Sequence, residues 1–232
     1  MISQNIHSIR TRIQEACLRS GRDPSSVLLL AVSKSFPPEM VNEAWGSGVE
    51  DFGENYVQEL IRKQKVLASR QIRWHFVGHL QTNKVRQIVE SIHLIHSVDN
   101  LRLVEEIQRR AEKVGRTIDV LVEVHTTAEA TKFGVPPEKT VQFVREISAF
   151  DRVRVKGLMT MGPFSEQPGD SRPSFRTVAG LARTIDGEGI PHVAMNQLSM
   201  GMTHDFEIAV EEGATILRIG TAIFGPRQKS AA

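Results

Sequence analysis

Apolar residues recur along the chain in short unbroken runs that are separated by longer segments with a helical period. The first run, Val27 to Ser33, is rich in Val and Leu and is followed by Lys34 and by the turn residues Pro37 and Pro38. Similar runs follow near residues 49–53, 72–78, 92–98, 118–124, 153–160, 192–198 and 214–220. Apolar runs of this length, bounded by turn residues, indicate strands buried on both faces, so we predict eight strands.

Helical spacing precedes the first run and separates the later ones. Residues 2–20 place apolar side chains on one face and end at Gly21, which predicts an amino-terminal helix outside the repeat. We also predict a helix from Asp99, as its amino cap, to Gly115, and others from Pro136 onward, from about 174 to 186, and from 205 to 212. A long loop is expected over residues 163–173, after the sixth strand.

Strand followed by helix, repeated eight times, predicts an α/β protein with a parallel sheet closed into a single (β/α)8 TIM barrel. An open doubly wound sheet is the alternative that this pattern leaves open. The barrel is expected over residues 27–227. No linker or shift in composition divides the chain, so residues 1–232 are expected to form one domain.

Composition narrows the class of protein. Charged residues are 24% and apolar residues 40%, which excludes a disordered chain, and no apolar stretch approaches the roughly 20 residues of a membrane span. A net charge of +2 with interspersed signs gives no footprint for nucleic acid. The single cysteine, Cys17, and the absence of a signal-like amino terminus lead us to expect a cytoplasmic protein. The helical spacing of Cys17 favours a packed residue over a reactive thiol.

Lys34 is the first candidate for chemistry, because it lies at the carboxyl edge of a buried strand. A lysine among apolar groups holds its proton less tightly, and its free amine condenses with an aldehyde to form a Schiff base. The alternative is a strand-ending lysine that reaches solvent.

The last two strands predict an anion site beside Lys34. In a closed barrel the first and eighth strands are neighbours, and the loops after strands seven and eight bind phosphate in many proteins of this fold. Strand seven ends in Ser199 and Gly201, which offer a hydroxyl and close approach of the backbone, and Gly220 and Thr221 end strand eight in the same way. Their convergence predicts a phosphate site.

Arg218 lies on the same face of its strand as Ile216 and Gly220, and if that face is the interior of the predicted barrel, the guanidinium is buried. A buried guanidinium needs a partner, because an unpaired buried charge is costly. A salt bridge to Glu123 is one possibility. A hydrogen bond to a heterocyclic nitrogen is the other, and an arginine, which keeps its own proton, would leave that nitrogen unprotonated.

Six segments, in order from about residue 27 to 227, resemble the pyridoxal phosphate homeostasis protein family. They are Ala31 to Lys34, Phe52 to Glu59, Trp74 to Lys84, Gly157 to Met161, Leu198 to Met202 and Arg218 to Gly225. The resemblance implies a barrel of the alanine racemase amino-domain type, fold type III-like, without the carboxyl-terminal β-domain of the racemases. It also implies that Lys34 holds pyridoxal 5′-phosphate as a Schiff base.

The same resemblance implies the other cofactor-binding residues. Arg218 is expected to face the pyridine nitrogen and Asn55 to line the pocket. The residues expected around the phosphate are Ser199, Met200, Gly201, Met202, Gly220 and Thr221. Thr203-His204 departs from the serine usual in the family, which leaves the phosphate contacts open. His79 and Met159 stand in matching motifs with either a packed or a cofactor-contacting role, and Lys132 is interpreted as a solvated loop residue with a secondary cofactor role as the alternative.

The family implies a carrier that takes part in intracellular pyridoxal phosphate homeostasis without turnover and delivers the cofactor to apo forms of pyridoxal phosphate enzymes. The alternative is an amino-acid racemase or decarboxylase on the same barrel. Racemisation needs a second acid/base opposite the lysine, which in the related racemases is a tyrosine from the additional domain, and the only tyrosine here is Tyr56. We expect no metal, no nucleic acid or membrane partner, and a monomer.

Overall fold

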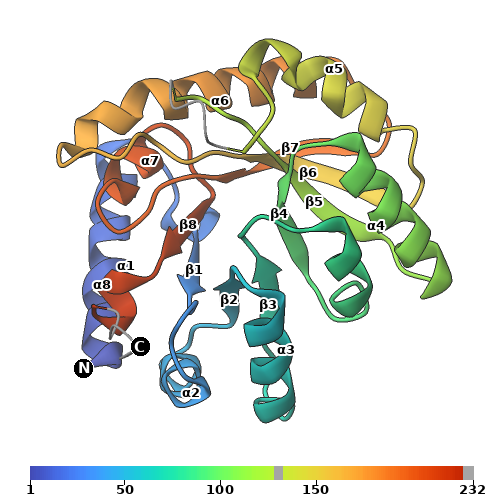
Figure 1. The fold of residues 1–232 in the computed structure, drawn as a ribbon. Helices are drawn as coiled ribbons and strands as arrows, with labels where there is room; N and C mark the ends of the chain where they lie inside the picture. The colour runs from blue at the N-terminus through green and yellow to red at the C-terminus, as the bar shows by residue number, and fades with distance from the viewer. Residues whose placement is uncertain (128–132, 227–232) are drawn as a thin grey trace.

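Eight parallel strands close into a barrel in chain order, with β8 returning to β1 (Figure 1). The structure is a computed structural model that describes residues 1–127 and 133–226, so Lys132 lies outside the described residues. The strands are β1 Leu28–Val32, β2 Asp51–Glu54, β3 Arg73–Phe76, β4 Leu94–Val98, β5 Ile118–Glu123, β6 Val153–Met159, β7 Val193–Ser199 and β8 Ile216–Ile219. The predicted closed barrel is confirmed, and the open sheet is excluded.

Helices surround the strands, as Figure 1 shows. They are α1 Ile2–Arg19, α2 Pro38–Gly46, α3 Val57–Val66, α4 Leu101–Lys113, α5 Pro137–Ile147, α6 Arg172–Asp186, α7 Phe206–Glu211 and α8 Thr221–Phe224, with the 3-10 turns η1 Pro24–Ser26, η2 Thr82–Gln87 and η3 Pro168–Ser171. Within the described ranges, no helix has the length and apolar character needed to cross a membrane.

Two local predictions were wrong. Asn100, rather than Asp99, caps α4, because the Asn100 side chain accepts a hydrogen bond of 2.9 Å from the Leu103 N–H. The expected loop over residues 163–173 is shorter than predicted, since η3 and the start of α6 occupy its second half. Every predicted strand boundary lies within two residues of the observed one.

Helix α1 lies beside α7 and α8, against the end of the chain that completes the barrel (Figure 1). Its buried face is the apolar stripe seen in the sequence, and Cys17 is fully buried in it, as predicted. Burial raises the pKa of the Cys17 thiol, so the free thiol stays protonated.

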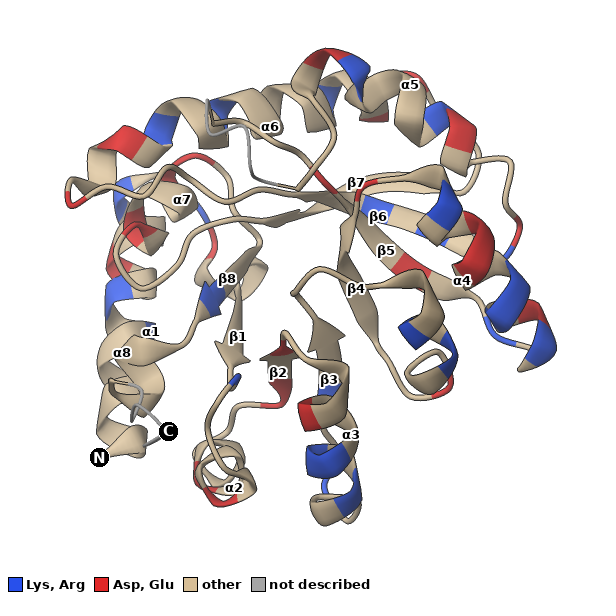
Figure 2. Cartoon of the chain, viewed as in Figure 1, with Lys and Arg blue, Asp and Glu red and all other residues tan. Residues whose placement is uncertain are grey.

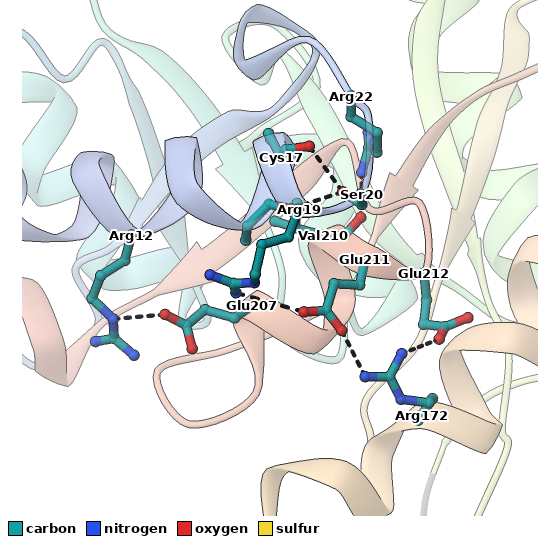
Figure 3. Close-up of polar contacts among 11 residues, drawn as sticks. Arg12, Cys17, Arg19, Ser20, Arg22, Arg172, Glu207, Val210, Glu211 and Glu212 are labelled. Carbon is teal, nitrogen blue, oxygen red and sulfur yellow. Dashed lines mark hydrogen bonds and ion pairs between the residues drawn. The ribbon is translucent and has the colours of Figure 1, made fainter.

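Ion pairs fasten the short helix α7 on two sides (Figure 3). From α1, Arg12 pairs with Glu207 at 3.0 Å and Arg19 with Glu211 at 3.5 Å. From α6, Arg172 contacts Glu211 at 2.6 Å. Because α7 follows the loop that ends β7, these contacts hold that loop at the rim of the barrel.

The barrel interior combines an apolar layer with buried polar groups. The apolar side chains form a small cluster of their own, separate from the larger core between strands and helices: Leu30, Leu94, Leu121, Met159 and Ile216. The buried polar side chains of β2, β3, β4, β7 and β8 include Asp51, His75, His96, Ser199 and Arg218. The sequence analysis anticipated a buried polar role only for Arg218.

A buried ion pair holds the segment that carries Lys34. The ammonium of Lys63, from α3, is fully buried and donates to Glu54 Oε1 at 2.6 Å and to the Ser33 carbonyl at 2.7 Å. The Ser33 hydroxyl donates to the same Glu54 oxygen at 2.6 Å. On the other side of Lys34, the Ser35 N–H donates to Glu59 Oε2 at 2.8 Å. Both neighbours of Lys34 are therefore fixed by β2 and α3.

The backbone at Ser35 needs this support, because its φ of 66° is unusual for a residue with a side chain. Burial raises the pKa of Glu54, and the charge and hydrogen bond of Lys63 act in the opposite direction. Glu54 Oε2 is buried without a hydrogen-bond partner among the described residues. The carboxylate therefore depends on Lys63 for its compensation.

Gly157 of β6 lies close to the backbone of β7. A Cβ built on Gly157 would lie 1.7 Å from the Gln197 carbonyl oxygen, which belongs to the neighbouring backbone. The register between β6 and β7 shifts between Val155 and Gly157. Glycine is therefore required at this irregularity.

We predict that Gly157→Ala lowers the free energy of unfolding by more than about 3 kcal/mol or prevents folding, because the backbone of β7 cannot move away without breaking the barrel. Gly180→Ala is the matched control, since the nearest atom to its new Cβ is 4.0 Å away within α6, and it should stabilise by roughly 0.5–1 kcal/mol. Urea denaturation of the three proteins measures both effects. Equal stability of Gly157→Ala and the parent would contradict the close approach.

We predict that Lys63→Met lowers the free energy of unfolding at neutral pH by about 3–5 kcal/mol, because it leaves the Glu54 carboxylate buried without its cation. The loss should be smaller in acid, where Glu54 is protonated. Lys65→Met, on the exposed side of the same helix, should cost less than about 0.5 kcal/mol. Denaturation at two pH values tests this, and equal losses at both would contradict an uncompensated Glu54 charge.

Candidate functional site

A pocket of about 680 Å³ opens at the carboxyl ends of the strands. The loops after β1, β2, β3, β6, β7 and β8 line it. The lining residues are Val32, Lys34, Phe36, Asn55, Val77, Met161, Gly162, Pro163, Phe164, Ser165, Gln167, Pro168, Ser171, Met202, Thr203, His204, Asp205, Arg218, Gly220 and Thr221. This is the face of the barrel where the sequence placed the candidate chemistry.

Six of the nine residues expected from the sequence line this pocket: Lys34, Asn55, Met202, Arg218, Gly220 and Thr221. They meet because β1 pairs with β8, with Leu30 opposite Arg218 in the register. Lys34 follows the end of β1 by two residues, and the Gly220 position lies close to the Val32 carbonyl.

The other three expected residues, Ser199, Met200 and Gly201, are buried and do not line the pocket. The Ser199 hydroxyl is engaged inside the barrel with Arg218 and His96. Gly201 has a φ of 90°, and a Cβ there would lie 2.5 Å from the Cβ of Ala209. Gly201 thus allows the β7 loop to pack against α7.

The Arg218 guanidinium is held by backbone and hydroxyl oxygens inside the barrel. One terminal nitrogen donates to the Ser199 carbonyl at 2.6 Å and to the Ser199 hydroxyl at 2.8 Å, and the other donates to the Thr160 carbonyl at 2.8 Å. Three of its five N–H donors are thus used, and Arg218 still lines the pocket.

The salt bridge between Arg218 and Glu123, considered from the sequence, is not formed within the described part of the chain. Burial lowers the pKa of Arg218 to about 10, while the charges of Asp205 and Glu123 act to raise it. Burial, and then the charge of Asp99, raises the pKa of Glu123 to about 7, against the effect of Arg218. Arg218 therefore remains a cation, with a carboxyl of reduced acidity in its surroundings.

Asn55 lines the pocket, and its side-chain oxygen lacks a hydrogen bond. Its Oδ1 is buried and has no hydrogen-bond partner among residues 1–127 and 133–226. A buried amide oxygen without a donor costs free energy, so this atom is poised for a ligand that brings a hydrogen-bond donor.

Hydroxyls from the loops after β7 and β8 meet at the pocket wall. Thr221 Oγ1 donates to Thr203 Oγ1 at 3.1 Å, beside the start of α8. Asp205 braces the loop, because its Oδ1 accepts from the Met202 N–H at 2.6 Å and its Oδ2 from the Ser171 hydroxyl at 2.7 Å. This geometry places Thr203, where the sequence departs from the family, opposite Thr221.

Sequence reasoning assigned no site role to Asp205 or to the apolar wall after β6. The wall follows Met159 and includes Phe164, whose side chain is 99% exposed. The sequence Met161-Gly162-Pro163-Phe164 could have predicted this wall. It follows a buried strand, and the loops at that end of a barrel line the site. From its position before a predicted helix, Asp205 could have been predicted as an amino cap.

Three further candidates lie away from the pocket lining. Met159 packs in the apolar cluster inside the barrel. His79 stacks on Phe133, with ring centroids 3.8 Å apart. Tyr56 precedes α3 and is 57% exposed. Packing therefore accounts for His79 and Met159, and Tyr56 projects to solvent.

The pocket's polar groups match a small molecule that carries an aldehyde, a ring nitrogen and an anionic group. Lys34 offers an amine, Arg218 offers N–H donors, and Thr203 and Thr221 offer hydroxyls. The unmet oxygen of Asn55 is a further contact for such a ligand. No group of three or more His, Cys, Asp or Glu side chains within the described ranges is arranged to hold a metal ion.

Comparison with known proteins agrees with this chemistry. The family model described as alanine racemase, N-terminal domain, matches residues 5–228. A pyridoxal phosphate homeostasis protein of Aquifex aeolicus is 44% identical over 97% of this chain and 98% of its own length. The structure of PipY from Synechococcus elongatus, solved with PLP bound, is 34% identical, with a TM-score of 0.83 over 97% of this chain and all of the PipY chain.

An alanine racemase of Clostridium difficile shares the fold at 12% identity, with a TM-score of 0.76. The match covers 99% of this chain and 57% of the racemase, so the barrel corresponds to one part of that enzyme. The full-length relatives, the family model and the ordered motifs agree, and this chain belongs to the pyridoxal phosphate homeostasis protein family.

Proposed function

We propose that this protein binds pyridoxal 5′-phosphate reversibly at Lys34 and takes part in intracellular pyridoxal phosphate homeostasis without turning over a substrate. The observation that carries the proposal is the meeting of Lys34, Arg218 and Thr221 in one pocket. The relative PipY, with PLP in its structure, supports the choice of ligand. When bound, this cofactor supplies an aldehyde that a lysine amine holds as a Schiff base and a ring that accepts electrons.

Each pocket residue has a distinct part in this proposal. Lys34 supplies the amine, and the contacts of Ser33 and Ser35 with α3 and β2 hold its backbone in place. Thr203 and Thr221 offer their hydroxyls to the phosphate in this proposal, beside the start of α8. Arg218 donates toward the ring nitrogen and, because it keeps its own proton, leaves that nitrogen unprotonated.

The same residues disfavour racemisation. Racemisation requires a second acid/base on the face opposite the lysine, and the only tyrosine, Tyr56, does not line the pocket. Apart from Lys34 and Arg218, the titratable residues lining the pocket in the described part of the chain are His204 and Asp205. Asp205 is engaged in bracing the loop, which leaves His204 as the residue that a racemase hypothesis must use.

We infer that the bound cofactor passes to apo forms of pyridoxal phosphate enzymes, and that the carrier acts as a cytoplasmic monomer. Acidic and basic residues are interspersed on the outer helices α4, α5 and α6 (Figure 2).

We predict that Lys34→Ala abolishes the adduct formed when the protein is mixed with pyridoxal phosphate and reduced with borohydride, because among the described lining residues no other lysine can replace the amine. Stability should change little, since the side chain is only partly buried. Lys84→Ala, outside the pocket, should keep the full adduct. Peptide mass mapping locates the pyridoxyl group, and its presence on Lys84 or Lys132 in the parent protein would contradict the assignment.

We predict that the loaded protein exchanges the α-deuterium of labelled alanine only very slowly, while it activates a cofactor-free acceptor enzyme. The reason is the weak electron demand of an unprotonated ring together with the absence of a tyrosine at the pocket. Both assays are run on one preparation. Rapid deuterium loss that disappears in Lys34→Ala and His204→Gln would establish the racemase alternative instead.

A further inference from the structure

A continuous line of buried polar side chains crosses the barrel interior and ends at Arg218. Asp51 Oδ1 lies 3.0 Å from His75 Nε2, and His75 Nδ1 lies 2.9 Å from His96 Nε2. His96 Nδ1 lies 2.9 Å from the Ser199 hydroxyl, which accepts from Arg218 at 2.8 Å. These residues come from five strands that meet only because the barrel is closed.

The line joins the two ends of the barrel. At the cofactor end, Arg218 lines the candidate pocket. At the amino-terminal end, Asp51 accepts hydrogen bonds of 2.8 and 2.6 Å from Arg73, whose side chain is 46% exposed. Between these ends His75, His96 and Ser199 are buried, so water does not replace their mutual contacts.

The ionisation of Asp51, at one end of this line, determines which atom donates the hydrogen bond in the contact with His75. Burial would raise the pKa of Asp51, but the hydrogen bonds and charges of His75 and Arg73 outweigh it and lower that pKa to about 2. Asp51 is therefore an acceptor only, and the facing nitrogen of His75, Nε2, must carry a hydrogen. In a neutral His75 ring the other nitrogen is then an acceptor.

The direction continues through His96. Complete burial, and then the nearby His75, Arg218 and His93, lowers the pKa of His96 well below its ordinary value, so this ring is neutral. With His75 neutral, as the proposal below takes it, His96 Nε2 donates to His75, and Nδ1 accepts the hydroxyl hydrogen of Ser199. The Ser199 oxygen is thereby left with its lone pairs directed to Arg218.

We propose that Asp51, His75, His96 and Ser199 are positioning residues that hold the Arg218 guanidinium toward the cofactor ring through a chain of hydrogen bonds with one fixed direction. The proposal rests on the proposed binding of pyridoxal phosphate beside Arg218. The Ser199 hydroxyl gives one terminal nitrogen of Arg218 a second acceptor beside the Ser199 carbonyl, while the Thr160 carbonyl holds the other terminal nitrogen.

The first test uses the protein without cofactor. Nitrogen-15 NMR of the imidazole rings, assigned with His75→Gln and His96→Gln, reports which nitrogen carries hydrogen. We expect hydrogen on Nε2 of both rings and none on Nδ1. Hydrogen on Nδ1 of His96, or a doubly protonated His75 at neutral pH, would overturn the chain. This readout is independent of ligand binding.

The second test asks whether the chain acts on the ring nitrogen. Affinity is measured for pyridoxal phosphate and for its 1-deaza analogue, in which C–H replaces the ring nitrogen. We expect Ser199→Ala and His96→Gln to reduce the preference for pyridoxal phosphate about fivefold, the factor of one hydrogen bond. His93→Gln is the control, because His93 packs against His75 at 5.1 Å between ring centroids but lies outside the chain.

The outcomes separate this inference from the function it rests on. Equal losses for both ligands in Ser199→Ala and His96→Gln, or an unchanged preference, would reduce the chain to a structural role and overturn the proposal. Failure of the parent protein to bind pyridoxal phosphate would refute the proposed function instead, while the NMR result would still decide the direction of the chain.

Discussion

The pairing of β1 with β8 is the contact on which the site depends. It places Leu30 beside Arg218 and Ala31 beside Ile219, so the loops that follow the two strands open onto one pocket. Lys34 and Thr221 are far apart in sequence, and only closure of the sheet brings them together. Helix α1 covers the same seam from outside, where it packs on α7 and α8 (Figure 1). The amino-terminal helix is therefore part of what holds the closure.

Buried charged side chains form two clusters next to the β1–β8 pairing. The Lys63–Glu54 pair holds the backbone around Lys34, and the polar line from Asp51 reaches Arg218. Each such arrangement costs desolvation, and removal of one partner from a buried pair typically costs about 3–5 kcal/mol. Replacement of a buried ion pair by well-packed apolar residues is often neutral or stabilising. Hydrogen bonds, unlike apolar contacts, fix the orientation of the groups that they join. The buried polar groups therefore orient Lys34 and Arg218 toward the pocket.

Sequence periodicity was sufficient for the strands, because strands buried on both faces appear in the sequence as apolar runs. It predicted a closed parallel barrel but left an open sheet as the alternative, which the observed pairing of β1 with β8 excludes. It could not reveal roles for His75 and His96. Each stands within such a run, where one polar residue looks like an interruption, and its partner lies on another strand at a register the sequence does not specify. Lys63 was missed for a similar reason, because on a helix of mixed polarity nothing distinguishes a buried lysine from the exposed Lys65.

The Ser-x-Gly turn at Ser199 lies at the predicted end of the barrel, but the Ser199 side chain does not line the pocket. A Ser-x-Gly turn after the seventh strand predicts an anion site, yet the pleat of β7 directs this side chain inward, to Arg218 and His96. The hydroxyls that reach the pocket belong to Thr203 and Thr221, farther along the two loops. Four residues separate the inward-facing Ser199, which supports Arg218, from Thr203, which lines the pocket. Because Ser199 contacts Arg218 inside the barrel and does not line the pocket, a change at Ser199 acts on a ligand through Arg218 and not through a direct contact.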